Sequence, residues 1–316
     1  MQNNKTADNT HFVAPFSEDT TVVVDRISVQ EKARSTWSDA WRQVRKRPMF
    51  WISALLIIAV IVVALFPFWF TNVAPNHGCD LSNSNAGPRA GHIFGFNMQG
   101  CDVYSRVIYG AQSSLTVGLV ATALVTIFGG LMGALAGFYG GFFDAILSRL
   151  GDIFFAIPTV LGAIVVMQMF AGARTPLTVA LVLAMFAWPQ IARIMRGSVL
   201  STKGSDFVMA STALGVSRFR ILIRHVIPNA IAPVIVVATI SLGTFIVAEA
   251  TLSFLGIGLP PDVMSWGNDI AAAQQSIRTA PMTLFYPAAA LSLTVLSFLM
   301  LGDVVRDALD PKARKR

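Results

Sequence analysis

Residues 49–70 read MFWISALLIIAVIVVALFPFWF and contain no charged side chain. At about 1.5 Å per residue, a helix of this length crosses a hydrocarbon core of about 30 Å. The stretch is too long for the apolar region of a secretory signal peptide and begins far from residue 1. We therefore expect it to be the first transmembrane span and to remain in the protein as an anchor.

Five more apolar blocks follow this span along the chain. They cover residues 113–138, 153–170, 176–192, 230–255 and 282–301. Of the 316 residues, 54% are hydrophobic and only 13% are charged, whereas soluble proteins average about 25% charged residues. The composition excludes a soluble enzyme, and the pattern predicts an all-α membrane protein with six transmembrane helices.

Lys and Arg are unevenly distributed between the segments that separate these blocks. Alternate segments are rich in them: Arg42, Arg45, Lys46 and Arg47; Arg149; Arg193, Arg196, Lys203, Arg218, Arg220 and Arg224; Arg306, Lys312, Arg314, Lys315 and Arg316. The other segments hold only Arg89, Arg106, Arg174 and Arg278. Because cytoplasmic loops carry the excess of positive charge, we predict two cytoplasmic termini and an extracytoplasmic loop at 71–112. The net charge of +7 then reflects contact with a lipid bilayer, and nucleic acid is not an expected partner.

The two ends of the chain are polar. Residues 1–35 lack a sustained apolar period, which predicts a disordered cytoplasmic tail, and residues 304–316 are a predicted basic cytoplasmic tail. Between them, residues 36–48 place Trp37, Trp41 and Val44 on one helical face beside a basic run. This pattern favours an interfacial elbow helix over a solvated helix stub, which would leave two tryptophans in water.

The predicted spans carry residues that affect helix packing. Gly129, Gly133 and Gly137 recur every four residues, which clears one helix face for close approach by another helix. Pro158 and Pro189 each remove a backbone hydrogen bond and permit a kink. These features indicate a tightly packed bundle but do not identify what it moves.

Glu249 is the one carboxylate well inside a predicted span. A buried carboxylate is costly unless it is protonated, paired or hydrated. Two interpretations remain open: a cavity or gate residue, or a carboxyl group bonded to neighbouring helices or close to the outer interface. The scarcity of other intramembrane charges argues against an ion-coupled carrier or channel, because coupling ions need ligands there.

Sequence motifs for catalysis are missing from the chain. It contains no HExxH, no GxSxG and no GxxxxGK[ST], which are the signatures of zinc proteases, serine hydrolases and phosphate-binding loops. We therefore expect a transport subunit that is not itself an enzyme and binds no metal or cofactor. Any energy for transport must come from another chain.

The segment 193–226 is the longest predicted internal cytoplasmic loop, and it has an ordered pattern. Apolar residues recur at helical spacing from Phe207 to Leu214, Gly215 supplies a stop, and the period resumes at Phe219. A short helix that exposes apolar side chains to the cytoplasm requires a protein partner to cover it. The loop is therefore a predicted docking element.

This loop resembles the signature of the transmembrane subunits of binding-protein-dependent ABC importers, which reads EAA, then a glycine, then I-x-LP. The matching residues are Met209, Ala210, Ser211, Gly215, Val226, Ile227, Pro228 and Asn229. Met209 replaces the usual Glu and Ser211 the second Ala, which weakens any role for a charged contact there. The resemblance implies that the coupling helix, with Phe207, Met209, Ala210, Ser211, Leu214 and Gly215, docks on an ATPase.

Within that family the chain resembles the C-type permease of dipeptide and oligopeptide importers. The resemblance rests on residues 102–119, 144–161, 193–201 and 249–270. It implies a type I importer fold with a five-span core at 113–303 in the prokaryotic plasma (inner) membrane. It also implies a homologous second permease, two cytoplasmic ATP-binding subunits or domains that hold ATP and Mg, and an extracytoplasmic peptide-binding protein. Permeases for nickel, haem or glycosides look much alike, so these cargoes remain alternatives.

Cys79 and Cys101 both lie in the predicted extracytoplasmic loop, a compartment that permits oxidation. The residues between them are polar and rich in Gly, Asn and Ser, so the loop has little apolar surface with which to order itself. We predict a disulfide, worth about 3 kcal/mol on the chain-entropy estimate, that shapes the loop for the binding protein or the partner permease. The alternative is two free thiols in a flexible loop.

Overall fold

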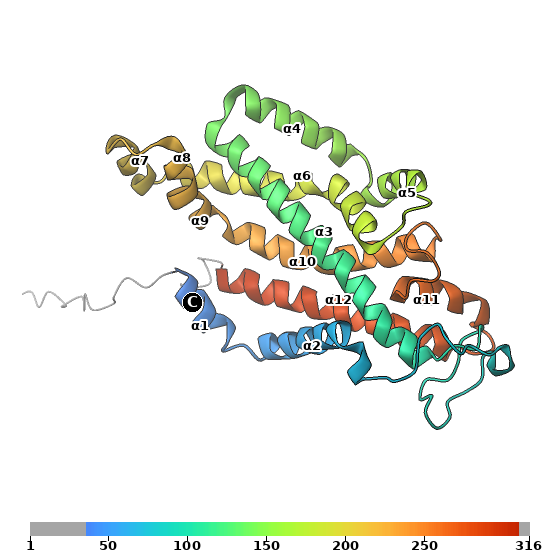
Figure 1. The fold of residues 1–316 in the computed structure, drawn as a ribbon. Coiled ribbons are helices and arrows are strands. Elements are labelled where there is room, and N and C mark those ends of the chain that lie inside the picture. The colour runs from blue at the N-terminus through green and yellow to red at the C-terminus, as the bar shows by residue number, and fades with distance from the viewer. Residues whose placement is uncertain (1–35, 310–316) are drawn as a thin grey trace, which may run out of the picture. The chain divides into compact units, whose positions relative to one another are not determined.

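The computed structural model describes residues 36–309 (Figure 1). The predicted disordered tail (1–35), the end of the predicted basic tail (310–316) and the side chain of Trp37 lie outside the described part. The described residues from 40 onward belong to one compact unit. The packing presented below is that of the described residues of this unit.

The described residues form twelve α-helices and no strand. These are α1 (Thr36–Val44), α2 (Pro48–Leu65), α3 (Val103–Tyr139), α4 (Gly141–Ala156), α5 (Thr159–Met169), α6 (Pro176–Lys203), α7 (Asp206–Ala213), α8 (Arg218–Ile221), α9 (Ile227–Ala230), α10 (Ala232–Phe254), α11 (Trp266–Ala273) and α12 (Met282–Leu309). Five of them (α2, α3, α6, α10 and α12) are long and apolar enough to cross a membrane. The predicted all-α membrane fold is confirmed.

The third predicted span, residues 153–170, is interrupted at Pro158, where the sequence permits a kink. The chain forms α4 and α5, bent by 86° at their junction, and the pair counts as a sixth span only if it is one broken span. The break follows from Pro158, which disfavours helical backbone at the residue before it. Ile157 is accordingly extended, at φ −93° and ψ 119°.

Other helix ends also differ from the prediction. α3 begins about ten residues before the predicted 113, because Asp102 caps it by accepting a hydrogen bond from the Ser105 backbone N–H at 2.7 Å. α2 stops at Leu65 and a short 3₁₀ turn begins at Pro67, so the α-helix ends inside the predicted first span (49–70). α12 continues to Leu309, past the predicted end of the core at 303.

The tightest contact in the bundle joins α3 and α6. Gly133 has no side chain where α6 passes, and a Cβ atom there would lie 2.2 Å from the Ala192 carbonyl oxygen. A Cβ atom on Gly129 or Gly137 would likewise lie 2.6 or 2.8 Å from a carbonyl oxygen of α6. The glycine spacing therefore predicted a close helix approach, and α6 is the helix that makes it.

The remaining spans pack around this pair. A second apolar cluster joins α2, α10, α11 and α12 to the N-terminal half of α3, where Val107, Ala111 and Leu115 are buried. At the opposite end, Arg47 before α2 forms an ion pair with Asp307 in α12. Figure 1 shows α7 and α8 at one end of the bundle, and α11 with the loop before α3 at the other.

Candidate functional site

The helix α7 projects from one end of the bundle with most of its surface uncovered. Val208 is buried and anchors it, whereas Met209 and Leu214 are 55% and 83% exposed. Among the predicted docking residues, Phe207, Ala210 and Gly215 are also exposed, and Ser211 is half-buried. The structure thus gathers all six predicted docking residues on one short projecting element.

Gly215 ends this element with a specific backbone geometry. Its φ is +75°, a conformation that glycine adopts without steric cost. The Gly215 N–H donates to the Thr212 carbonyl at 3.0 Å, and the Val216 N–H donates to the Ser211 carbonyl at 3.2 Å. This pair of bonds is the Schellman motif, and it leaves Leu214 at the outermost point of the turn.

A cavity of about 690 Å³ lies between α7, α8 and the ends of α3 and α6. Its lining residues are Phe138, Tyr139, Lys203, Val208, Met209, Thr212, Ala213, Arg218 and Ile221. The Lys203 Nζ donates to the Phe138 carbonyl, which places a positive charge at the C-terminal end of α3, where the helix dipole favours it. The C-terminal ends of α3 and α6 are therefore joined by a hydrogen bond.

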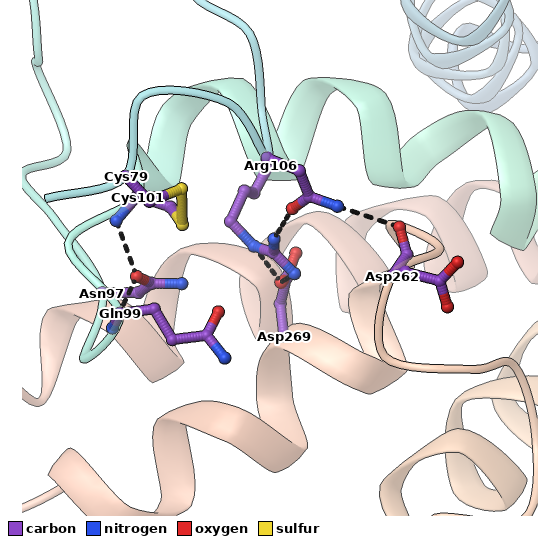
Figure 2. Close-up of a disulfide and its surroundings, with 8 residues drawn as sticks. Cys79, Asn97, Gln99, Cys101, Arg106, Asp262 and Asp269 are labelled. Atoms are coloured by element: carbon purple, nitrogen blue, oxygen red, sulfur yellow. Dashed lines mark hydrogen bonds and ion pairs between the residues drawn. A yellow bond between two sulfur atoms is a disulfide. The ribbon is translucent and has the colours of Figure 1, made fainter.

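The loop at the opposite end of the bundle contains the predicted cysteines, which are bonded to each other in the structure (Figure 2). The loop is more ordered than its composition predicts, because polar groups replace the missing apolar core. The Asn97 Oδ1 accepts hydrogen bonds from the backbone N–H groups of Gln99 and Cys101, at 3.0 and 2.9 Å. Hydrogen bonds from Ser82 hold the pKa of the Asp80 carboxyl below its usual range.

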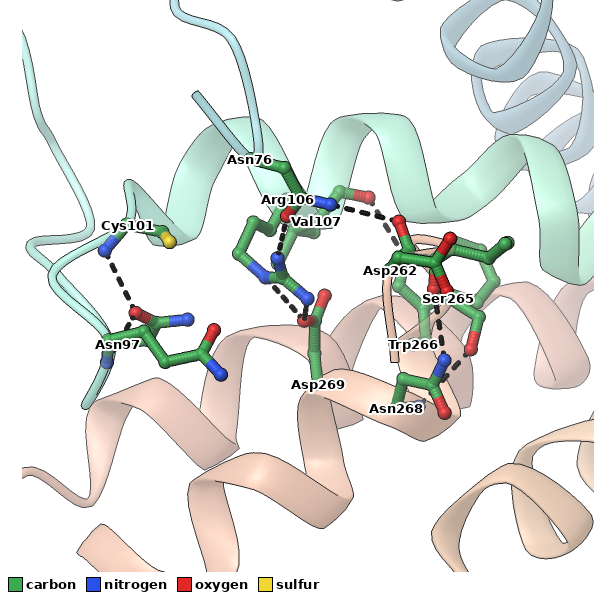
Figure 3. Close-up of polar contacts among 12 residues, drawn as sticks. Asn76, Asn97, Cys101, Arg106, Val107, Asp262, Ser265, Trp266, Asn268 and Asp269 are labelled. Atoms are coloured by element: carbon green, nitrogen blue, oxygen red, sulfur yellow. Dashed lines mark hydrogen bonds and ion pairs between the residues drawn. The ribbon is translucent and has the colours of Figure 1, made fainter. Parts of the chain in front are cut away.

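Beside the disulfide lies a buried ion pair that sequence analysis did not identify. The Arg106 Nε of α3 donates to the Asp269 Oδ1 of α11 at 2.7 Å, and both side chains are less than a tenth exposed. Arg106 also donates to the Asn76 side chain, whose own amide donates to the Asp262 carbonyl at 2.9 Å (Figure 3). The network connects α3, α11 and the loops that precede each of them.

α11 is fixed at this end by further polar contacts (Figure 3). Ser265 caps the helix by accepting from the Asn268 backbone N–H at 3.1 Å. The Trp266 indole donates to the Val107 carbonyl of α3 at 3.0 Å, and the Asn268 amide donates to the Pro260 carbonyl at 2.9 Å. These bonds join α11 and the 255–265 loop to the N-terminal half of α3.

Glu249 lies in α10 with none of its surface exposed. Its carboxyl accepts hydrogen bonds from Ser114 of α3 at 2.9 Å and from Ser253 of its own helix at 2.8 Å. These contacts correspond to the second interpretation of this residue, a carboxyl bonded to neighbouring helices. The side chain therefore faces the bundle interior and joins α3 to α10.

Comparison with known proteins adds the following. Residues 129–315 match the family described as binding-protein-dependent transport system inner membrane component. Residues 35–88 match the N-terminal TM domain of oligopeptide transport permease C. The chain is 38% identical over 284 residues to the glutathione transport system permease protein GsiD of Escherichia coli O1:K1, covering 90% of this chain and 93% of that protein. GsiD of Shigella boydii serotype 4 gives the same values, and GsiD of Shigella dysenteriae serotype 1 is 37% identical.

Proposed function

The chain belongs to the family of binding-protein-dependent transport system inner membrane components, and from this we propose that it is the permease subunit of an ATP-driven importer of dipeptides or oligopeptides. The likeness to GsiD over nine-tenths of both chains carries the proposal, since glutathione is itself a short peptide. The match of residues 35–88 to an oligopeptide permease domain supports the same cargo class. Nickel, haem and glycosides are not favoured by either comparison.

The proposed complex contains this chain, a homologous second permease, two cytoplasmic ATP-binding subunits or domains and an extracytoplasmic peptide-binding protein. ATP and Mg are held by the ATPases. α7 supports the ATPase assignment, because Leu214 and Met209 expose apolar surface that a protein partner would cover. Movement of the ATPases would pass through α7 to the spans and switch the bundle between inward-open and outward-open states.

The orientation is part of the proposal. The end of the bundle that holds α7 also holds Arg218, Arg220 and Arg224, and the excess of positive charge places such segments in the cytoplasm. Both termini would then be cytoplasmic, and the disulfide loop would face outward. The compartment would be the inner membrane of a prokaryote.

A transport experiment tests the proposal. Cells that lack only this chain should fail to take up labelled di- to hexapeptides, and the gene for the wild-type chain should restore uptake. The Leu214→Asp variant should insert into the membrane but lose both the co-purifying ATPase and uptake, because a charge replaces the outermost apolar side chain of the docking element. Leu81→Asp is the matched control, since Leu81 is 75% exposed in the opposite loop; it should keep the ATPase.

Two results would contradict the proposal. Unchanged peptide uptake in cells without the chain, with loss of another cargo, would refute peptide import. Normal ATPase binding by the Leu214→Asp variant would refute the docking role of α7 and leave the cargo assignment untouched.

A further inference from the structure

The helix α2 is only just long enough to cross a membrane. It is the long apolar helix in the part of the chain that matches a TM domain, residues 35–88. It has 18 residues and no charged side chain, and at about 1.5 Å per residue it is about 27 Å long, against a hydrocarbon core of about 30 Å. A helix of this length has no spare residues, so both of its ends lie next to the polar headgroups. The turn that precedes Pro48 therefore lies at one surface of the bilayer.

Aromatic side chains at the two ends of α2 agree with this level. At the start of the helix, Trp41 and Trp51 are each more than half exposed. Just after its end, Phe68 and Trp69 are exposed to the same extent. Tryptophan rings are enriched at both interfaces between lipid and water. The aromatic residues therefore mark the same two surfaces that the length of α2 gives.

The two ends of α2 differ in charge. Residues 42–47 contain four cationic side chains, whereas residues 48–88 contain no Lys or Arg. One of the four, Arg47, is neutralised by its ion pair with Asp307 of α12. The other three are exposed and form no ion pair with a carboxylate of the described side chains: Arg42, Arg45 and Lys46. One end of α2 thus carries three uncompensated positive charges at the surface of the bilayer.

The turn between α1 and α2 is held in one shape by contacts with the rest of the protein. Val44 is buried in a small apolar cluster with Val304 and Ala308 of α12. The Trp51 indole donates a hydrogen bond to the Arg45 carbonyl oxygen at 3.0 Å. The three charges are therefore carried by an ordered turn, and the Trp51 ring lies directly beside it.

We infer that this turn, residues 41–51, is a binding site for the headgroup of an anionic phospholipid in the bilayer that α2 crosses. Guanidinium and ammonium groups donate charge-assisted hydrogen bonds to phosphate oxygens, and basic residues directly beside a span attract anionic lipids. Trp41 and Trp51 contact the same lipid at the boundary of its acyl chains. The inference is independent of the proposed cargo. With the proposed orientation, the lipid belongs to the cytoplasmic leaflet.

Fluorescence quenching by brominated lipids tests the inference on the full-length chain. Cys79 and Cys101 are bonded to each other, so one introduced cysteine supplies the thiol that takes the fluorophore. Met49→Cys places the fluorophore in the first turn of α2, and Leu65→Cys in the last turn is the matched control, because both residues are exposed. Each labelled chain is reconstituted into phosphatidylcholine vesicles that contain brominated phosphatidylglycerol or the same amount of brominated phosphatidylcholine.

At low salt, the label at Met49→Cys should report a preference of about tenfold or more for phosphatidylglycerol, the value expected when one headgroup meets two of the three cations. The label at Leu65→Cys should report no preference. Salt at about 1 M should abolish the preference at Met49→Cys, because the screening length falls to about 3 Å. Combined replacement of the three cations, as Arg42→Gln, Arg45→Gln and Lys46→Gln, should abolish it at low salt as well.

Three results would overturn the inference. The first is equal quenching by the two lipids at Met49→Cys in low salt. The second is an equal preference for phosphatidylglycerol at Leu65→Cys, because the selectivity would then not come from the three cations. The third is quenching by neither lipid at Met49→Cys while Leu65→Cys is quenched, as expected if a protein covers the turn. The salt series requires no change of charge, so it decides the question even if the triple variant fails to insert.

Discussion

Replacement of Arg106 by methionine should destabilise the end of the bundle that holds α11. Asp269 then keeps its buried position but loses its hydrogen bond and its ion-pair contact at Oδ1, while its Oδ2 has no partner among the described residues even in the wild type. Removal of one partner from a buried ion pair costs about 3–5 kcal/mol, because an uncompensated charge remains. Replacing both partners, as Arg106→Met with Asp269→Leu, should cost far less, since no charge is left behind.

The cost should appear as local opening of α11, because this helix has only eight residues. Hydrogen exchange followed by mass spectrometry measures such opening directly. At about 1.4 kcal/mol for each factor of ten, peptides from 266–273 should exchange roughly a hundredfold faster or more in the Arg106→Met variant. The double variant should exchange close to the wild-type rate.

Arg278→Met is the matched control, because Arg278 is exposed and follows the same helix. Its exchange across 266–273 should equal that of the wild type. An Arg106→Met variant whose exchange stays within a factor of three of the wild type would refute the reasoning. A double variant whose 266–273 amides exchange as fast as those of the Arg106→Met variant would also refute it.

Three further predictions concern single positions. Gly133→Ala should lower the melting temperature strongly, because the added Cβ would collide with the backbone of α6. Gly130→Ala is the control and should not lower it, because a Cβ at Gly130 meets open space. Equal melting temperatures of the two variants would contradict this prediction. Glu249→Gln should keep peptide uptake, because the amide can still bond Ser114 and Ser253. Glu249→Leu should reduce expression, because each buried hydroxyl left without a partner costs about 1–3 kcal/mol of stability. A peptide map without reductant should recover Cys79 linked to Cys101; recovery of both as alkylated free thiols would disprove the bond.

Hydropathy was enough to predict the long spans but failed where charge enters a helix. α4 was missed because Asp144, Arg149 and Asp152 interrupt its apolar run, and a charged stretch at a helix end is indistinguishable from a loop by hydropathy alone. The first turns of α3 were missed for a related reason. Residues 103–112 include Arg106 and other polar side chains, which find their partners only in the folded protein.

In the candidate site, too, features set by neighbouring residues could be predicted, whereas contacts between residues far apart in the sequence could not. α7 could be predicted because the apolar period from Phe207 and the stop at Gly215 are local signals. The Arg106–Asp269 pair could not, because its members are 163 positions apart and nothing in either neighbourhood specifies the other. An Arg and an Asp beside apolar blocks were the only available signal.

The contact between α3 and α6 restricts how the protein can change shape. At Gly133 the Ala192 carbonyl of α6 occupies the space that a side chain would fill. Packed backbones do not deform continuously. Neither helix can therefore slide or rotate past the other without a collision. We therefore expect the two helices to move as one rigid unit in any change of conformation. Spin labels on α3 and α6 should keep a constant separation when the conformation changes, and an altered separation would contradict this expectation.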